Sequence, residues 1–514
     1  EMSQPRLLCA CLLICRTGAV ALKVQQCSAQ HPALRERRQC SARARACTRA
    51  CTTLCALNAA DAQGDAAAPL PALPPLLRGR SNTAAIWRVA WPSVVIGLLR
   101  AALGQVDAWY VGRLGSVQLQ AISAASFLVW VVYIAGELCS VGVHALSSAA
   151  EGAGDRSDGV GAAVVQGLWF AVAASAAIAA LASRPALLAA YFSAVGVTEP
   201  SVAAAGEAYA RVTAVWGTLP LSAEACVLAG FKGIGETRPA LAIAALTVVL
   251  NAALNGPFIA RDGVAGAAWA TNLSAAAGCL TALLALSRRG VRLRLRPPSL
   301  RALRRIGVIG APLASSGLLF SAVYVALGRA LAALSPSYLA ALGVGHRIEA
   351  MAYTACEGYA VGTATVVGQW AGARRPNGAV KAAGAAARVA VATMLPILVL
   401  VYGCAAPAVR LFSRDAVVVG AAAQYLRIVA LVFPVMAVEA VYEGALTGVQ
   451  QMLPVLLVGI VGNLARVPLA MALLPRYGVT GVWLAIAIST AFKAPAKWLC
   501  FRRAPKRAVE LPDA

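Results

Sequence analysis

Carboxylates inside long apolar runs are the residues of this chain that most need a chemical explanation. Asp107 is the first of them, in the stretch GQVDAWYVGRLG near the end of an apolar run that starts before Trp91. An ionisable side chain is costly in apolar surroundings, so it usually faces a protein interior or a water-filled cavity and marks an ion or substrate pathway. Asp107 is therefore either a helix-end residue at the water interface or a buried functional group.

Two residues that precede Asp107 bear on its chemistry. Arg100 lies seven residues earlier, two helical turns away on the same face and about 10 Å along the axis. If the two side chains approach each other, they form a structural salt bridge. If Arg100 reaches away, Asp107 is a desolvated carboxyl that can carry a proton. We favour an ion-coupling role for Asp107, with Arg100 and Gln105 as residues of a cavity.

Five glutamates in later apolar runs are further candidates for ion coupling: Glu137, Glu224, Glu357, Glu439 and Glu443. They either line a shared cavity or have only a packing role. Glu439 and Glu443, in EAVYEG, are four residues apart and therefore lie on one helix face. As like charges they would share a proton, which makes them the best coupling candidates in the second half of the chain.

Two histidines and their neighbours complete the set of candidates. His144 lies seven residues after Glu137, and histidine is the side chain most easily switched near neutral pH. Its alternative role is that of a buried histidine satisfied by hydrogen bonds. The stretch GVGHRIEAMAYTACEG places His346 three residues before Glu349, with Arg347 between them. Arg347 either holds an anionic substrate or joins Glu349 in an internal ion pair.

Twelve apolar runs must position these residues. The 514 residues are 60% hydrophobic and 13% charged, with a mean hydropathy of +0.72, whereas a soluble protein has about a quarter charged residues. A helix that crosses a bilayer needs about 20 apolar residues. The sequence therefore predicts an all-α polytopic membrane protein. Its twelve transmembrane helices are expected at 85–110, 118–147, 159–182, 203–230, 237–260, 264–287, 306–333, 337–368, 379–406, 416–447, 453–474 and 479–501.

The distribution of basic residues predicts the orientation in the membrane. With twelve spans both termini share a side, and the loops on that side carry most of the Lys and Arg, including eight between Arg288 and Arg305. The positive-inside rule places this side in the cytosol, or in the stroma of a plastid. The net charge of +24 then needs no nucleic acid, since no zinc finger, basic helix or aromatic RNA-binding pattern accompanies it. The 288–305 loop is a topology anchor or a linker between two lobes.

The two halves of the chain resemble each other. With an offset of 220, AWPS at 90–93 matches GAPL at 310–313, GELCSVG at 136–142 matches CEGYAVG at 356–362, SSAAEGA at 147–153 matches VGQWAGA at 367–373, and YFS at 191–193 matches LFS at 411–413. With an offset of 215, GVAGAAWA at 263–270 matches GVTGVWLA at 478–485 and Pro239 matches Pro454. Because each half has six spans, the two copies have the same orientation, as in a parallel 6+6 repeat about an axis along the membrane normal. This repeat predicts two six-helix lobes around a central cavity, with alternating access.

The sequence resembles the multidrug and toxic compound extrusion (MATE) transporters over roughly residues 84 to 503. The resemblance is carried by QVDAWYVGRLG, GFKGIGETRPA, GVAGAAWAT and GQWAGARRP, in that order, together with the 6+6 repeat. Asp107 is similar to the first-span Asp of the bacterial-type branch, which plant plastid members also resemble. The acidic motif of span seven found in many eukaryotic members is missing from GLLFSAVYVALG.

The resemblance implies an antiporter that exports organic solutes against an inward flow of protons or sodium ions. Bacterial-type members pair the first-span Asp with an Asn-x3-Asp motif on span five. Here LNAALNGPF supplies Asn251 and Asn255, so the motif has become Asn-x3-Asn. Its helix face stays polar but loses its charge. Asp107 is then expected either to work without its usual acidic partner or to leave coupling to the glutamates of the second lobe.

Residues 1–80 differ in composition from the rest. They contain eight of the 14 cysteines and stretches such as RERRQCSARARACTRACTTLC, which are basic and poor in acids. This composition predicts a disordered segment that includes an organelle transit peptide, with a plastid favoured, followed by a linker. The alternative is a disordered cytosolic tail. The remaining boundaries are an N-lobe at 84–287, the loop at 288–305, a C-lobe at 306–503 and a C-terminal tail at 504–514.

Other classes of function are disfavoured. The cysteines lack zinc spacing, and no HExxH, GxSxG or nucleotide-binding loop is present. We therefore expect no metal, no cofactor and no enzymatic activity. A lipid-linked oligosaccharide flippase shares the general architecture but would carry more cationic residues in its cavity, and a channel fits the 6+6 repeat less well. The expected partners are the bilayer, a small organic solute and a proton or sodium ion, for a monomeric protein in the plastid envelope or another membrane.

Overall fold

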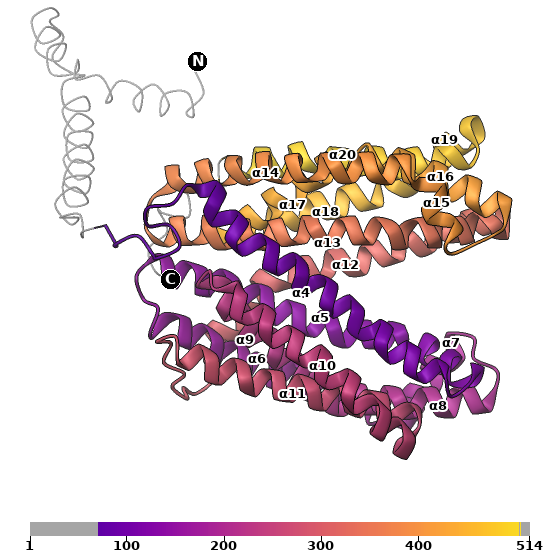
Figure 1. Ribbon diagram of the computed structural model, residues 1–514, viewed down its shortest axis with the longest axis horizontal. Helices are drawn as coiled ribbons and strands as arrows, with labels where there is room; N and C mark the ends of the chain where they lie inside the picture. The colour runs from indigo at the N-terminus through magenta and orange to yellow at the C-terminus, as the bar shows by residue number, and fades with distance from the viewer. Residues whose placement is uncertain (1–69, 503, 505–514) are drawn as a thin grey trace, which may run out of the picture. The chain divides into compact units, whose positions relative to one another are not determined.

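The computed structural model describes residues 70–502 and residue 504, and every regular element within them is helical (Figure 1). The predicted transit peptide lies outside the described residues, as does nearly all of the C-terminal tail. Ten helices of the described part are long and apolar enough to cross a membrane, and a bent pair makes an eleventh. The helix of the eighth predicted span, at Pro336–Gly372, is not among them, because charged and polar residues interrupt its apolar sequence.

The helices follow the twelve predicted spans. The N-lobe consists of α4 (Asn82–Gly112), α5 (Ser116–Gly152), α6 (Gly159–Ala182), α7 (Pro185–Ala194), α8 (Pro200–Arg211), the π-helix η1 (Val212–Gly217), α9 (Thr218–Gly233), α10 (Thr237–Asp262) and α11 (Val264–Ser287). The C-lobe consists of α12 (Leu300–Leu334), α13 (Pro336–Gly372), α14 (Pro376–Gly403), α15 (Ala405–Arg410), α16 (Ala416–Ala430), α17 (Phe433–Gly448), α18 (Leu453–Leu464), α19 (Arg466–Tyr477) and α20 (Val479–Phe501).

Three predicted spans consist of more than one element: the fourth (α8, η1 and α9), the tenth (α16 and α17) and the eleventh (α18 and α19). Proline explains the division of the last two. The tenth span is α16 followed by α17, bent by 55°. Pro434 lies four residues after Ala430, where α16 ends, and Pro468 lies four residues after Leu464, where α18 ends. A proline ring clashes with the carbonyl group four residues earlier and donates no hydrogen bond to it. The short connecting helices α7 and α15 were not predicted, because the apolar pattern around them is too short for a span.

Two glycines form equivalent corners in the two halves. Gly263 joins α10 to α11 with φ 60°, and Gly478 joins α19 to α20 with φ 57°. Only glycine adopts this part of the backbone map without strain. Since these glycines are the first residues of the matched motifs GVAGAAWA and GVTGVWLA, one turn requirement accounts for both copies.

Close helix packing makes the repeat visible in space. A Cβ atom added to Gly152 on α5 would lie 2.2 Å from the carbonyl oxygen of Gln369, and one added to Gly372 on α13 would lie 2.1 Å from that of Ala149. The two glycines are related by the offset of 220, and so are their two partners, which makes each contact the repeat copy of the other. The pseudo-twofold axis therefore passes between α5 and α13 at this point, where small residues let the backbones touch.

The first helix of each lobe also packs on the other lobe. The first half of α4 contacts α13, where Gly358 lies against the carbonyl oxygen of Ala90. In the repeat copy of this contact, Gly310 of α12 lies against that of Leu138 on α5. Figure 1 shows α4 running from the C-lobe helices at its start to the N-lobe helices at its end.

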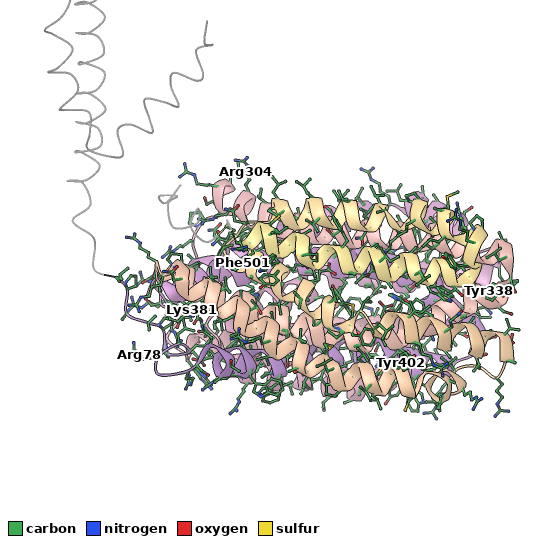
Figure 2. All side chains as sticks on the ribbon, turned by 90° about the horizontal axis from the view of Figure 1, so that it is seen from above. Arg78, Arg304, Tyr338, Lys381, Tyr402 and Phe501 are labelled. Carbon is green, nitrogen blue, oxygen red and sulfur yellow. The ribbon has the colours of Figure 1, made fainter. Side chains whose placement is uncertain are left out.

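Both ends of the described chain lie at one end of the helical body. Figure 2 shows Arg78, Arg304, Lys381 and Phe501 at this end, called here the terminus side, and Tyr338 and Tyr402 at the other. Residues 288–299, between α11 and α12, join the lobes on the terminus side, in line with the basic residues that the sequence places there. The predicted loop is therefore shorter than 288–305, because residues 300–305 form the first turns of α12. Residues just before α4 already belong to the folded body, because Leu76 and Leu77 are buried in its core. The folded body therefore begins before the boundary that the sequence predicts at residue 80.

Candidate functional site

Asp107 is held by three neutral hydrogen-bond donors from two other helices. It is 5% exposed on α4. Its Oδ1 accepts hydrogen bonds from Asn251 Nδ2 at 3.0 Å and Asn255 Nδ2 at 2.8 Å, both on α10, and its Oδ2 accepts one from Thr271 Oγ1 of α11 at 2.8 Å. The Asn-x3-Asn spacing places both amides on one helix face, so α10 presents two donors to a single carboxylate. Asp107 is a buried group and not a helix-end residue at an interface.

Arg100 does not pair with Asp107. Its guanidinium donates to Glu137 Oε1 at 2.8 Å and to the Tyr133 hydroxyl at 3.4 Å, both on α5. In the described part of the chain no cationic side chain forms an ion pair with Asp107. The sequence left open whether Arg100 pairs with Asp107 or points away from it. In the structure Arg100 points away, and the Asp107 carboxyl lies among neutral groups.

Asp107, Arg100 and Glu137 line one cavity in the N-lobe, whereas Asn251 and Asn255 are fully buried behind its lining. The cavity has a volume of about 340 Å³ and is bounded by α4, α5, α8 to α11 and η1. Its charged lining residues are Arg100, Asp107, Glu137 and Glu224, so carboxylates exceed cationic groups by two. Glu224 accepts a hydrogen bond from Thr247 Oγ1 at 2.6 Å. An excess of buried carboxylates over cations favours the binding of positively charged ions.

In the C-lobe, two buried acids form ion pairs with lysines. Lys497 of α20 donates to Glu439 Oε1 at 2.9 Å and also to Glu443, and Lys493 lies 3.0 Å from the same Glu439 oxygen. The expectation that Glu439 and Glu443 share a proton is wrong in this structure, because an ammonium group lies between them. The sequence does show two lysines four residues apart in KAPAK. No spacing rule, however, predicts that they pair with acids more than 50 residues earlier on another helix.

The repeat shows what the N-lobe has at the position of Lys493. Glu224 and Glu439 are related by the offset of 215, and the position of Lys493 corresponds to that of Gly278. A Cβ atom on Gly278 would lie 2.3 Å from Glu224 Oε1, so a side chain there would displace the Glu224 carboxylate from its present position. In the C-lobe, the residue that corresponds to Thr247 is Gly462, and the Lys493 side chain packs over this glycine. One lobe thus satisfies its glutamate with a hydroxyl and the other with ammonium groups.

The remaining candidates fall into separate places. Glu349 accepts a hydrogen bond from Tyr425 and contacts His346 Nδ1 at 3.2 Å, so the predicted ion pair with Arg347 is not formed, and Arg347 is exposed. Gln105 is exposed on α4 and does not line the N-lobe cavity. Neither residue lines the N-lobe cavity, and the cavity role assigned to each of them stays a prediction.

His144 and Glu357 lie where the lobes meet. His144 is buried and its Nε2 lies 2.9 Å from Thr365 Oγ1 on α13. Thr365 in turn donates to the Lys232 carbonyl at 2.9 Å, which joins α13 to α9. His144 is therefore a hydrogen-bonded histidine and not the partner of Glu137. Glu357 is exposed on α13, within electrostatic reach of Glu137 and Glu443.

A network of charges closes the N-lobe loops on the terminus side. Arg156 donates to Glu151 at 2.7 and 2.8 Å and to Glu236 at 3.2 Å, and Arg289 also pairs with Glu236. The hydrogen bonds to Glu151 raise the pKa of the Arg156 guanidinium above its ordinary value. Arg156, Glu236 and Arg289 lie outside the membrane-spanning segments, and Glu151 lies in the last turn of α5. The network ties α5, α9 and α11 together at their ends.

Comparison with known proteins places the chain among membrane transporters. A sequence profile of the MatE family matches residues 92–256 and 312–472, two segments whose first residues are related by the larger offset of the repeat. A probable multidrug resistance protein NorM of Deinococcus radiodurans is 30% identical over 445 residues, covering 83% of this chain and 93% of that protein. A protein of Thermotoga maritima with the same description is 23% identical over 437 residues, covering 82% and 93%.

Solved structures agree on the fold. An outward-facing multidrug resistance MATE family transporter of the MOP superfamily matches with a TM-score of 0.76 and 22% identity, over 85% of this chain and 98% of that one. A MATE structure in a bent conformation matches with a TM-score of 0.77 and 23% identity, over the same shares. The predicted all-α architecture with two six-helix lobes is confirmed.

Proposed function

The chain belongs to the MatE family, and we propose that it exports organic solutes from the compartment that holds its termini, in exchange for protons or sodium ions that enter there. Members of this family are transporters and not enzymes, and the apolar helices of this chain make it an integral membrane protein. What we propose beyond membership of this family is the class of solute and the ion that is exchanged for it.

The observation that carries the proposal is the environment of Asp107. A carboxylate that is 5% exposed and bonded only to amide and hydroxyl groups has no buried countercharge, so a cation that reaches it supplies the missing charge. A proton does this by neutralising the group. Among the described residues, Asn255 Oδ1 is also buried without a hydrogen-bond partner. An oxygen ligand is therefore available beside the carboxylate if the ion is Na⁺, which as a hard cation prefers oxygen ligands in the same way as Ca²⁺ and Mg²⁺.

The contacts between the lobes support alternating access. Those of Gly152 with Gln369, of Gly372 with Ala149 and of His144 with Thr365 all lie at the ends of α5 and α13 nearest the terminus side. Closure on this side directs the Asp107 cavity toward the opposite side, from which the coupling ion enters before the lobes rock. The positive-inside rule makes the terminus side cytosolic or stromal.

The location in the plastid envelope is a further part of the proposal. It rests on the acid-poor composition of residues 1–80, most of which lie outside the described residues. A fluorescent protein fused after residue 80 is expected to accumulate in plastids of plant cells. A diffuse cytosolic signal would contradict the targeting proposal and leave the transport proposal unchanged.

The transport proposal is tested in proteoliposomes that contain the full chain. Uptake of ethidium, a fluorescent organic cation, is measured with a pH gradient in sodium-free buffer, and separately with a sodium gradient at equal pH on both sides. We expect one gradient to drive uptake in the wild type and Asp107→Asn to lower that initial rate at least about tenfold, because the variant cannot take up the coupling charge.

Asp262→Asn is the matched control. It makes the same chemical change at a carboxylate at the end of α10 that pairs only with the largely exposed Arg261 at 3.6 Å, so the driven rate should stay within about twofold of wild type. Full gradient-driven uptake by Asp107→Asn would refute the assignment of Asp107. Equal loss in both variants would show that the effect is unspecific.

A further inference from the structure

The C-lobe holds a buried cation at the place where the N-lobe holds its ion site. Asn251, which donates to Asp107, corresponds to Arg466 at the offset of 215, which also relates Gly263 to Gly478. The repeat position of Asp107, at an offset of 220, is Leu327. The two lobes are thus charge-inverted at this point: one has a carboxylate among neutral donors, and the other has a guanidinium that pairs with no acid of the described chain.

Arg466 is almost completely buried and only partly satisfied. It is 3% exposed. Its Nε donates to Ser489 Oγ at 2.9 Å and its Nη2 to Thr490 Oγ1 at 3.0 Å, and its Nη1 is buried without a hydrogen-bond partner in the described part of the chain. A buried charge without a countercharge is costly, and an unsatisfied buried donor adds to that cost. A group so placed calls for a functional explanation.

No acid of the C-lobe compensates this charge. Within the described residues no carboxylate lies within ion-pair distance of Arg466. Glu439 and Glu443 are occupied by Lys493 and Lys497, and Glu349 is bonded to Tyr425 and His346. The nearby ammonium of Lys493 adds to the positive potential at Arg466.

Aromatic rings form the rest of the surroundings. The Arg466 guanidinium carbon lies 5.3 Å from the ring centre of Phe320 and 5.6 Å from that of Tyr324, both on α12. The ring of His346 on α13 packs against Tyr324 at 4.8 Å and against Phe320 at 5.8 Å. His346 has 38% of its side chain exposed, so this cluster, called here the Arg466 cluster, contains both a buried charge and a partly exposed ring.

We propose that the Arg466 cluster is a binding site for an organic anion, an aromatic carboxylate whose oxygens accept hydrogen bonds from Nη1 of Arg466 and whose ring packs beside His346 and Tyr324. Guanidinium groups bind carboxylates with charge-assisted hydrogen bonds, and the hydroxyls of Ser489 and Thr490 fix the orientation of the fork. This inference rests on the proposed transport function for its role, since it makes an organic carboxylate one of the solutes carried.

Binding is tested without any gradient, so the result does not depend on the coupling mechanism. The purified full chain in detergent micelles is titrated with benzoate, with benzamide and with decanoate by isothermal calorimetry. We expect benzoate to bind and benzamide to bind at least about tenfold more weakly, because the amide lacks the charge that Arg466 compensates. Decanoate is expected to be the weaker carboxylate, because its chain cannot pack as a ring does.

The variants identify the residue. Arg466→Gln should weaken benzoate binding at least about tenfold, whereas Arg410→Gln, at an exposed arginine of α15 in the same lobe, should leave it unchanged. Equal binding of benzoate and benzamide by the wild type would overturn the proposal even if Arg466→Gln does not fold. Stronger binding of decanoate would overturn the aromatic assignment in favour of a lipid carboxylate. Benzoate binding together with failed ethidium transport would leave this site standing and refute only the antiport of organic cations.

Discussion

The contact between Gly152 and Gln369 provides the most direct test of how the lobes close. In Gly152→Ala, the new Cβ would lie 2.2 Å from the Gln369 carbonyl oxygen, whereas ordinary contact begins at 3.4 Å. The backbones of α5 and α13 must therefore separate by about 1 Å, and neither is a flexible side-chain end. Overpacking of this kind costs about 1–3 kcal/mol, and the cost falls on the state that is closed on the terminus side.

This cost corresponds to a change of about 5-fold to 150-fold in the equilibrium between closed and open lobes. Hydrogen–deuterium exchange followed by mass spectrometry measures it directly, because amides protected by closure exchange in proportion to the population of the open state. We expect faster exchange in peptides that cover the ends of α5 and α13 nearest the terminus side, and unchanged exchange in α7 and α15.

Gly256→Ala is the control, since Gly256 is a helical glycine of the N-lobe with nothing within 4 Å of its added Cβ. Gly372→Ala should reproduce the effect of Gly152→Ala, and the double variant should cost less than the sum, because one displacement of the helices relieves both contacts. Exchange in Gly152→Ala that matches that of Gly256→Ala would refute the closure at the pseudo-twofold axis.

Two further substitutions test the charged sites. Lys497→Met leaves Glu439 and Glu443 without the ammonium that lies between them, and breaking such a buried pair costs about 3–5 kcal/mol. The midpoint temperature of thermal unfolding should therefore fall. An unchanged midpoint would show that the ion pair is not formed. Asn255→Leu removes the 2.8 Å donor to Asp107, a hydrogen bond to a charged group worth about 1.5–3 kcal/mol. The initial rate of gradient-driven ethidium uptake should then fall about tenfold or more, and an unaltered rate would separate Asn255 from the coupling site.

Much of the fold could be predicted from the sequence. Apolar runs of about 20 residues or more indicate helices that cross a membrane, and each predicted span coincides with one helix or with consecutive helical elements. The breaks at Pro434 and Pro468 were not predicted, because the same residue lies inside unbroken helices at Pro92 and Pro312. Whether a proline bends a helix depends on what its neighbours offer to the freed carbonyl group.

The partners of the charged residues were predicted less well than the residues themselves. Arg100 lies two turns from Asp107 yet bonds to Glu137 on the next helix, and Arg347 next to His346 forms no ion pair with Glu349 in the described part of the chain. Spacing along one helix states which side chains share a face, but it does not state which other helix that face meets.

The sequence by itself determined the succession of spans, their orientation relative to one another, the repeat, and which acidic residues lie within the apolar spans. Only the tertiary structure decided how each acid is compensated: Asp107 by the amides and hydroxyl of α10 and α11, and Glu439 by lysines of α20, while Arg466 meets no carboxylate among the described residues. Helix formation depends on local apolar pattern and length, which a sequence contains. Compensation of a buried charge depends on atoms brought within about 3 Å from helices distant in the chain, and their packing sets that distance.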